Sequence, residues 1–158
     1  MKFTDFISSN AIVVDLKSTS KKEVVREMAQ ALQAADNFDD ETRERVVEAV
    51  LNREDLGPTS VGRGIAVPHA KCVGVDRLVG LIAISREGVD FASLDSQPVY
   101  LFFMIVSPFE RPGDHLRALE HITLRLKNEE FVEELKGASD ASVAYALLQK
   151  VDSSSVEA

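Results

Sequence analysis

The chain has 158 residues but only one cysteine and no tryptophan. A single cysteine, Cys72, excludes an internal disulfide and is consistent with a reducing cytoplasm. No apolar run approaches the roughly 20 residues that a membrane helix needs. The longest, Val99 to Val106, fits a buried strand. The first residues include Asp5 and lack the basic start of a secretory signal. We therefore predict a cytoplasmic protein with no direct membrane insertion.

Basic residues are scarce relative to acidic ones. The chain carries 18 lysines and arginines against 26 aspartates and glutamates, a formal net charge of −8. A nucleic-acid-binding face needs clustered lysine and arginine, so we predict no nucleic acid partner. An acidic surface instead attracts a partner protein with a positive patch.

Several sequence signatures of enzyme sites are missing. The glycine-rich segment 57–64 lacks the Gly-Lys-Ser/Thr ending of a phosphate-binding P-loop, and it precedes a strand where a P-loop precedes a helix. No G-x-S-x-G elbow of a serine hydrolase is present. His69 and Cys72 form H-x-x-C, but His115 and His121 cannot share one helical face, and only one thiolate is available for zinc. We predict no metal and no other cofactor, and keep a small zinc domain as a minor alternative.

Hydrophobic patterning predicts one α/β domain over residues 1–151, with a mixed parallel and antiparallel sheet and helices on both faces. The S-x-x-E run at Ser20 has the form of a capping box and predicts a helix start. The three later strand runs are too continuously apolar for a sheet with one wet face. The expected strands are 12–16, 64–67, 78–85 and 99–106, the expected helices are 20–37, 39–54, 114–127, 129–135 and 141–151, and the polar tail 152–158 is expected to fray.

His69 stands at the end of an apolar strand, in the run Gly64-Ile65-Ala66-Val67-Pro68-His69-Ala70-Lys71. Histidine changes charge near neutral pH, so a neutral ring can act as a nucleophile without elaborate activation. Pro68 fixes one backbone angle before it and should hold the ring in place. A lone histidine at a strand end is usually a half-exposed surface residue. The residues that surround His69 decide between the two interpretations.

Two further side chains are candidates for the same site. Arg53, near the end of the second helix, is either a solvated helix-end cation or a guanidinium that forks onto two phosphoryl oxygens. His115 borders the apolar stripe of its helix (Leu116, Leu119, Ile122, Thr123 and Leu126), near an N-terminus where an anion is favoured. His121 lies on the opposite side of the same helical wheel, so we predict that it faces solvent.

The loop before His69 contains three glycines and Thr59. Its backbone N–H groups, with Gly62 and Gly64, and the Thr59 hydroxyl could hold a phosphoryl group. Equally, the glycines could serve only as turn residues. Arg63 could either help bind phosphate or face solvent.

Taken together, the run Arg53-Glu54-x-Leu56-Gly57-x-Thr59-x-x-Gly62-x-Gly64-Ile65-Ala66-Val67-Pro68-His69-Ala70 closely resembles the phosphohistidine motif of the fructose/mannitol/nitrogen-regulatory enzyme IIA family. This family belongs to the bacterial phosphoenolpyruvate-dependent phosphotransferase system. The resemblance extends over nearly the whole chain, through Asp114-His115-Leu116 to the last helices. Pro58, Arg63 and Ala70 depart from the residues that the family most often has there.

The resemblance implies a phosphocarrier whose His69 accepts a phosphoryl group from a carrier protein of the HPr type, at Nε2. His115 is similar to the family's second histidine and Arg53 to its active-site arginine, and no metal or nucleotide is implied. The run 51–57 looks more like the nitrogen-regulatory branch, which implies control of other proteins by phosphorylation. The alternatives are a sugar-specific enzyme IIA that passes the phosphoryl group to a separate IIB protein, and a binding module that is never phosphorylated.

Overall fold

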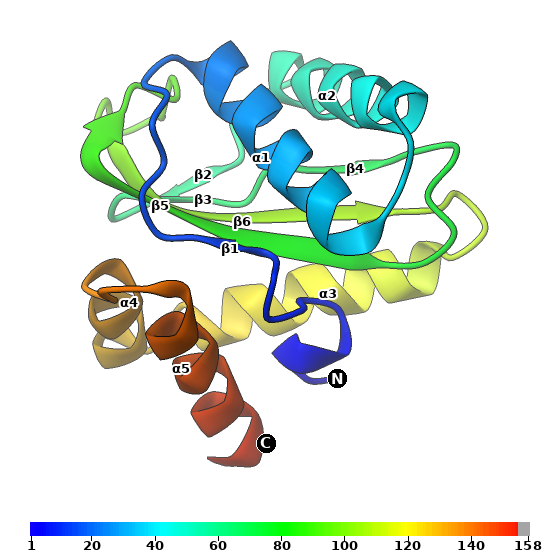
Figure 1. Cartoon of the computed structure of the whole chain (residues 1–158). Coiled ribbons are helices and arrows are strands. Elements are labelled where there is room, and N and C mark those ends of the chain that lie inside the picture. Colours follow the sequence, from blue (N-terminus) through cyan, green and yellow to red (C-terminus); the bar gives the residue numbers. More distant parts are fainter. Residues whose placement is uncertain (155–158) are drawn as a thin grey trace.

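The computed structural model describes residues 1–154, and the last four residues lie outside that part. A mixed sheet separates two layers of helices (Figure 1). Helices α1 (Lys21–Asp36) and α2 (Asp40–Asp55) cover one face, and the other face is covered by α3 (Pro112–Arg125), α4 (Glu129–Lys136) and α5 (Ala141–Ser154). This confirms the predicted α/β architecture with helices on both faces.

The sheet is organised around one long antiparallel pair, β5 (Val79–Val89) and β6 (Val99–Ser107). The short strand β1 (Ile12–Val13) lies parallel to β5 on its outer side. On the far side of β6 run β3 (Ile65–Ala66) and β4 (His69–Lys71), both parallel to it, and β2 (Ser60–Gly62) pairs antiparallel with β3. The order is therefore β1-β5-β6-β3-β2, with β4 also on β6.

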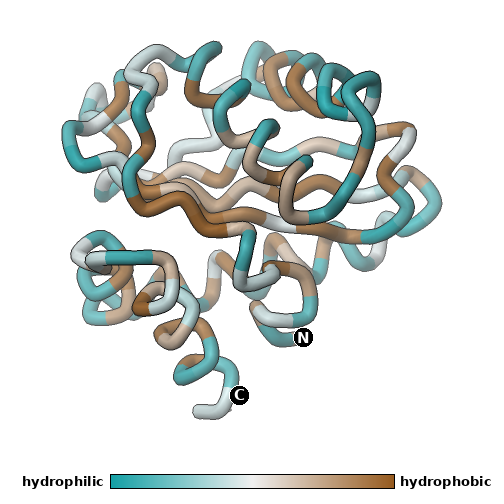
Figure 2. Tube along the Cα trace, viewed as in Figure 1, coloured by the Kyte–Doolittle hydropathy of each residue, from teal (hydrophilic) through white to brown (hydrophobic). Residues whose placement is uncertain are grey.

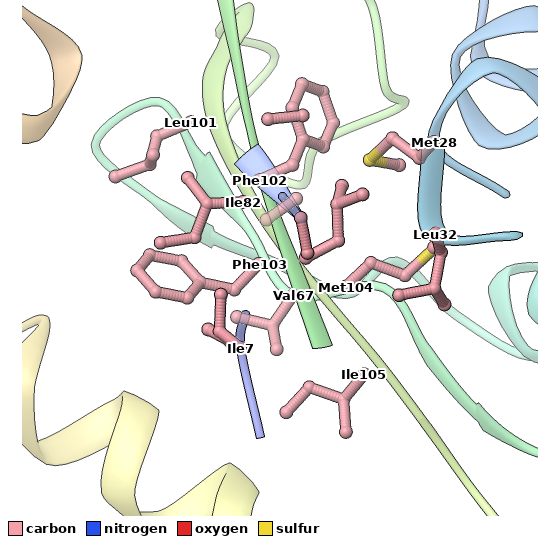
Figure 3. Packing of buried hydrophobic residues seen from close by; sticks show 14 of the residues in the cluster. Ile7, Met28, Leu32, Val67, Ile82, Leu101, Phe102, Phe103, Met104 and Ile105 are labelled. Carbon is pink, nitrogen blue, oxygen red and sulfur yellow. The ribbon is translucent and has the colours of Figure 1, made fainter. Parts of the chain in front are cut away.

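The core lies on both faces of β6, where every residue except Tyr100 is buried, and the strands of the sheet are largely brown in Figure 2. Alternate side chains of a strand point to opposite faces. Phe102 and Met104 accordingly point toward α1, where Met28 and Leu32 pack, whereas Leu101, Phe103 and Ile105 point to the side of α3 (Figure 3). Coverage of both faces explains why the strand is apolar at nearly every position.

The helix termini follow the local sequence signals. Asp39 caps α2 by accepting a hydrogen bond from the Thr42 N–H at 2.8 Å. Helix α1 starts directly after Ser20, as the S-x-x-E pattern predicts. The reciprocal backbone bonds of a capping box do not form there, because the Ser20 hydroxyl donates to the Glu23 carboxylate at 3.0 Å. The position of the helix was predictable, but the bonds at its start were not.

Two regions extend beyond the predicted elements. Strand β5 continues to Val89 through a register irregularity that includes Gly88, whose φ is +91°. Helix α5 continues to Ser154, so the tail expected to fray from Asp152 is helical as far as it is described. Asp152 accepts hydrogen bonds from the Phe3 and Thr4 N–H groups, which ties the helix end to the N-terminal 3₁₀ turn Phe3–Asp5. The expectation for residues 155–158 lies outside the described part.

Candidate active site

The segment that carries His69 is one strand interrupted by a proline. Ile65 pairs with Leu101 and His69 pairs with Ile105, so β3 and β4 keep the same register along β6. Pro68 has no N–H to give to the ladder, but its carbonyl accepts from the Ile105 N–H at 3.0 Å. The Val67 N–H turns the other way and donates to the Thr59 carbonyl at 3.0 Å. The break leaves the Val67 carbonyl free to meet the side chain of His69.

The His69 ring is held by one hydrogen bond, in which Nδ1 lies 2.7 Å from the Val67 carbonyl oxygen. A carbonyl can only accept, so Nδ1 carries the proton and a neutral ring presents a bare lone pair at Nε2. Burial lowers the pKa of His69, and the positive charge of Arg53 lowers it further, against the opposing effects of the Val67 carbonyl and Glu54. The half-buried ring is therefore neutral at pH 7, with a lone pair at Nε2.

The second histidine lies next to the first. His115, in the first turn of α3, is buried, and its ring centroid lies 5.5 Å from that of His69. Its Nδ1 lies 2.6 Å from the hydroxyl oxygen of Ser107, the last residue of β6. Burial, the neighbouring His69 and the charge of Lys71 lower the pKa of His115 to about 4. The structure thus brings together the two histidines that the sequence analysis singled out.

These lowered pKa values predict an acid-sensitive fold. The unfolded chain takes up protons near the ordinary histidine pKa of 6.5, whereas folded His115 takes one up only near pH 4. The free energy of unfolding should therefore have its highest value above pH 6.5 and should decrease as the pH drops toward 4. His115 alone should contribute about 2 kcal/mol of this loss between pH 7 and pH 5.

The measurement is urea unfolding over this pH range, in wild type and in His115→Gln. The variant should lose part of the pH dependence but not all of it, because burial also lowers the pKa of His69 and His121. An identical pH dependence in the two proteins would contradict the buried, neutral state of His115.

Arg53 approaches His69 from α2. Its guanidinium donates to the Gly57 carbonyl at 3.0 Å, and its charge acts on the His69 ring. This contact holds the half-buried side chain in the turn after the helix and leaves other N–H groups of the guanidinium available to an anion. Arg53 is thus placed with the two histidines.

The same turn is held by a buried carboxylate. Glu54, whose side chain is fully buried, accepts from the Thr59 N–H at 3.3 Å and from the Thr59 hydroxyl, and it forms an ion pair with Lys21 at 3.4 Å. The Thr59 hydroxyl is therefore committed to Glu54. Thr59 supports the site through its carbonyl, which accepts from Val67, and not through a free hydroxyl as the sequence analysis allowed.

Gly62 and Gly64 do not join the site. Both have positive φ, +84° at Gly62, which ends β2, and +76° at Gly64, in the turn that leads to β3. The Gly64 carbonyl accepts from the Tyr100 and Leu101 N–H groups, near the start of β6. His69 pairs with Ile105, about 13 Å further along that strand. The structure therefore places these glycines as turn residues.

Arg63 is exposed, as one of its two interpretations had it, but its side chain also has a protein partner. Its guanidinium donates to the Leu126 carbonyl at 2.6 Å, at the C-terminal end of α3. It binds the C-terminal end of α3, opposite the first turn that carries His115.

The prediction for His121 is wrong. Its ring packs edge-on against Phe3 with centroids 4.6 Å apart, and its Nε2 is buried without a hydrogen-bond partner. The helical wheel could not show this, because the N-terminal 3₁₀ turn covers that side of α3. The buried face of α3 agrees with the predicted stripe at Ile122 and Leu126, which are buried, but differs from it because Ala118 is buried whereas Leu116 is 58% exposed.

Two residues of the site lacked a functional assignment in the sequence analysis. Glu54 lies in the last turn of α2, where the helix dipole disfavours an acid, and such a position indicates a specific partner. Ser107 ends an otherwise apolar strand, so its hydroxyl needed a buried partner. Both signals were present, but neither identifies the partner without the fold.

Other kinds of site find no support in the described part of the chain. Among residues 1–154, no three histidine, cysteine, aspartate or glutamate side chains are placed to hold a metal ion. The Cys72 thiol is buried and donates to the Val73 carbonyl. No helix within this part combines the length and the apolar character that crossing a membrane requires.

Comparison with known proteins identifies the family of this fold and site. Residues 5–151 match the family described as phosphoenolpyruvate-dependent sugar phosphotransferase system, EIIA 2. A nitrogen regulatory protein of Bradyrhizobium diazoefficiens is 36% identical over 94% of this chain and 95% of its own. The structure of nitrogen regulatory protein IIA-Ntr from Neisseria meningitidis is similar with a TM-score of 0.81, at 30% identity over 91% of this chain and 97% of that one. Mannitol enzyme IIA of Escherichia coli, in its complex with phosphorylated enzyme IIB, gives a TM-score of 0.73 at 25% identity over 90% and 96% of the two chains.

Proposed function

Since the chain belongs to the EIIA 2 family of the phosphoenolpyruvate-dependent sugar phosphotransferase system, we propose that it is a phosphocarrier whose His69 accepts a phosphoryl group from an HPr-type phosphohistidine protein. The observation that carries this proposal is the hydrogen bond from His69 Nδ1 to the Val67 carbonyl. It keeps the proton on Nδ1 and leaves a neutral imidazole's lone pair at Nε2, as a phosphoryl acceptor requires.

The transfer needs no acid or base. A bond forms between His69 Nε2 and phosphorus while the bond from phosphorus to the donor's ring nitrogen breaks, and that nitrogen recovers the electron pair. Nδ1 keeps its proton and its bond to the Val67 carbonyl. The phosphorylated ring is then cationic beside a phosphoryl anion, so catalysis consists of positioning and charge stabilisation.

Arg53 and His115 supply that stabilisation in the proposal. The free N–H groups of Arg53 can hold two phosphoryl oxygens. If the Ser107 hydroxyl donates to His115 Nδ1, the ring proton stands on Nε2 and can be donated to a third oxygen. Because the pKa of His115 is about 4, its ring donates as a neutral group at pH 7. A neutral ring does not repel a cationic side chain of the donor protein.

Exposed apolar residues near the site give the donor protein a surface to contact. Leu56 follows Arg53 at the end of α2 and is 85% exposed, Phe109 follows β6, and exposed Leu116 follows His115. Large apolar side chains exposed close together mark protein-binding sites. We propose that the carrier protein contacts these three residues.

Leu56→Glu should therefore raise the KM for phosphorylated HPr by about tenfold, because a charge replaces an apolar contact at the interface. The kcat should change little, since no group that touches phosphorus is altered. Leu94→Glu, which changes an equally exposed leucine in the loop between β5 and β6, is the matched control. Equal KM values for the two variants would count against this docking surface.

The chain's use of the phosphoryl group follows from its relatives. Similarity to nitrogen regulatory proteins supports a regulatory role in the cytoplasm, in which phosphorylation of His69 controls binding to target proteins. The alternative is a sugar-specific enzyme IIA that passes the phosphoryl group to a separate IIB protein, and it is supported by the likeness to mannitol enzyme IIA. Loss of label from the phosphorylated chain on addition of a purified IIB protein would favour the alternative.

The test of the proposed function is the intact-protein mass after incubation with phosphoenolpyruvate, enzyme I and HPr. We expect one acid-labile phosphoryl group per chain. An unlabelled chain, with the donor proteins fully phosphorylated, would contradict the proposal and favour a binding module that is not phosphorylated.

A further inference from the structure

Lys71 is a cation of the site that neither the sequence motif nor the proposed transfer uses. It is the last residue of β4, two positions after His69, so the two side chains point to the same face of the sheet. Their Cα atoms are about 7 Å apart, a gap that the flexible four-carbon stem of lysine can span.

The register of β4 places Lys71 beside the second histidine as well. Lys71 pairs with Ser107, whose hydroxyl oxygen lies 2.6 Å from Nδ1 of His115. The charge of Lys71 is close enough to help lower the pKa of that ring. Lys71, Ser107, His115 and His69 thus form one group on the same side of the sheet.

The ammonium group of Lys71 has no partner among residues 1–154, since neither an ion pair nor a hydrogen bond engages it there. The acid next to His115, Asp114, is already paired with Arg111 and Arg117.

The ammonium group of the half-buried Lys71 has no other partner among the described residues, so it can form a charge-assisted hydrogen bond with an anion bound at the neighbouring nitrogen of His69. Arg53 reaches His69 from α2, so a phosphoryl group on Nε2 would meet a guanidinium from one side and Lys71 from the strand itself. We infer that Lys71 binds the phosphoryl group on His69 and sets how long the phosphohistidine persists. This inference rests on the proposed phosphocarrier function.

The test compares Lys71→Met and Lys71→Arg with wild type. Each protein is phosphorylated by phosphoenolpyruvate, enzyme I and HPr, and separately by phosphoramidate, a small donor that needs no docking surface. We then remove the donors and measure the lifetime of the phosphohistidine at pH 7. We expect Lys71→Met to shorten the lifetime by about tenfold with either origin of the phosphoryl group, and Lys71→Arg to restore most of it.

Lys127→Met is the matched control, because it removes the same charge from an exposed residue at the other end of α3. A second readout is the NMR titration of His115 in the unphosphorylated proteins. Its pKa should rise in Lys71→Met and stay unchanged in Lys127→Met. This shift tests the position of the Lys71 charge beside His115, and the phosphohistidine lifetime tests its contact with the phosphoryl group.

The outcomes separate the two proposals. A labelled wild type with an unchanged lifetime in Lys71→Met would overturn the role of Lys71 alone. A wild type that takes no phosphoryl group from either donor would overturn the phosphocarrier function and, with it, the role of Lys71.

Discussion

Replacing His69 by alanine is expected to abolish phosphorylation of the chain and to leave its fold intact. The variant removes the nitrogen that accepts the phosphoryl group, and neither His115 nor His121 is placed to accept it instead. The ring of His115 is buried with Nδ1 against Ser107, and that of His121 packs against Phe3. Intact-protein mass with the full donor chain should show no added phosphoryl group.

The structural cost of that change should be small. The half-buried His69 makes one hydrogen bond to the Val67 carbonyl, and β4 is held to β6 by backbone bonds that alanine keeps. The free energy of unfolding should change by no more than about 1 kcal/mol, with a single cooperative transition. A phosphorylated variant would show that the acceptor is another residue, and an unfolded variant would make the loss of label uninformative. In the latter case His69→Gln, which retains a side chain of similar polarity, replaces it.

Replacing His115 by alanine should slow phosphoryl transfer by about 100-fold without removing the acceptor. The variant removes a pre-positioned donor whose ring lies 5.5 Å from that of His69, and loss of one such donor typically costs a factor of 100 or more. Single-turnover transfer from phosphorylated HPr is the measurement. Label should still reach His69, slowly, which distinguishes this variant from His69→Ala.

His121→Gln is the control for that experiment, since it alters a histidine of the same helix that contacts Phe3 and not His69. It should lower stability and leave the transfer rate unchanged. His115→Ala leaves the buried Ser107 hydroxyl without its partner and should cost about 1 to 3 kcal/mol of stability. Equal transfer rates in wild type and His115→Ala would mean that the second histidine only packs beneath the first.

Most of the fold was predictable from the sequence, because the apolar residues of the strands and helices follow clear patterns. The continuous apolar run of β6 requires cover on both faces, and caps such as Asp39 mark where helices begin. Strand β4 could not be predicted, since its three residues are a strand only through their pairing with β6. Likewise β2, a three-residue strand with a shifted register, reads in the sequence as a loop.

The site was predictable where the motif names its residues and not where distant segments meet. The structure brings His69, Arg53 and His115 together, and the roles assigned to them stay predictions. The glycines could not be placed from sequence, because their distance from His69 depends on how far the chain advances along β6 between Ile65 and His69. His121 was misplaced because the turn that covers it lies more than a hundred residues away in the chain.

The shared register of β3 and β4 restricts how this segment can vary over evolution. Both pieces pair with the same strand on either side of Pro68, so the number of residues between Ile65 and His69 decides which face of the sheet the histidine meets. One residue inserted or deleted there would turn His69 toward α1 and α2 and away from His115. Substitutions can accumulate in these residues, but changes of length should be eliminated by selection in any descendant that still transfers phosphoryl groups.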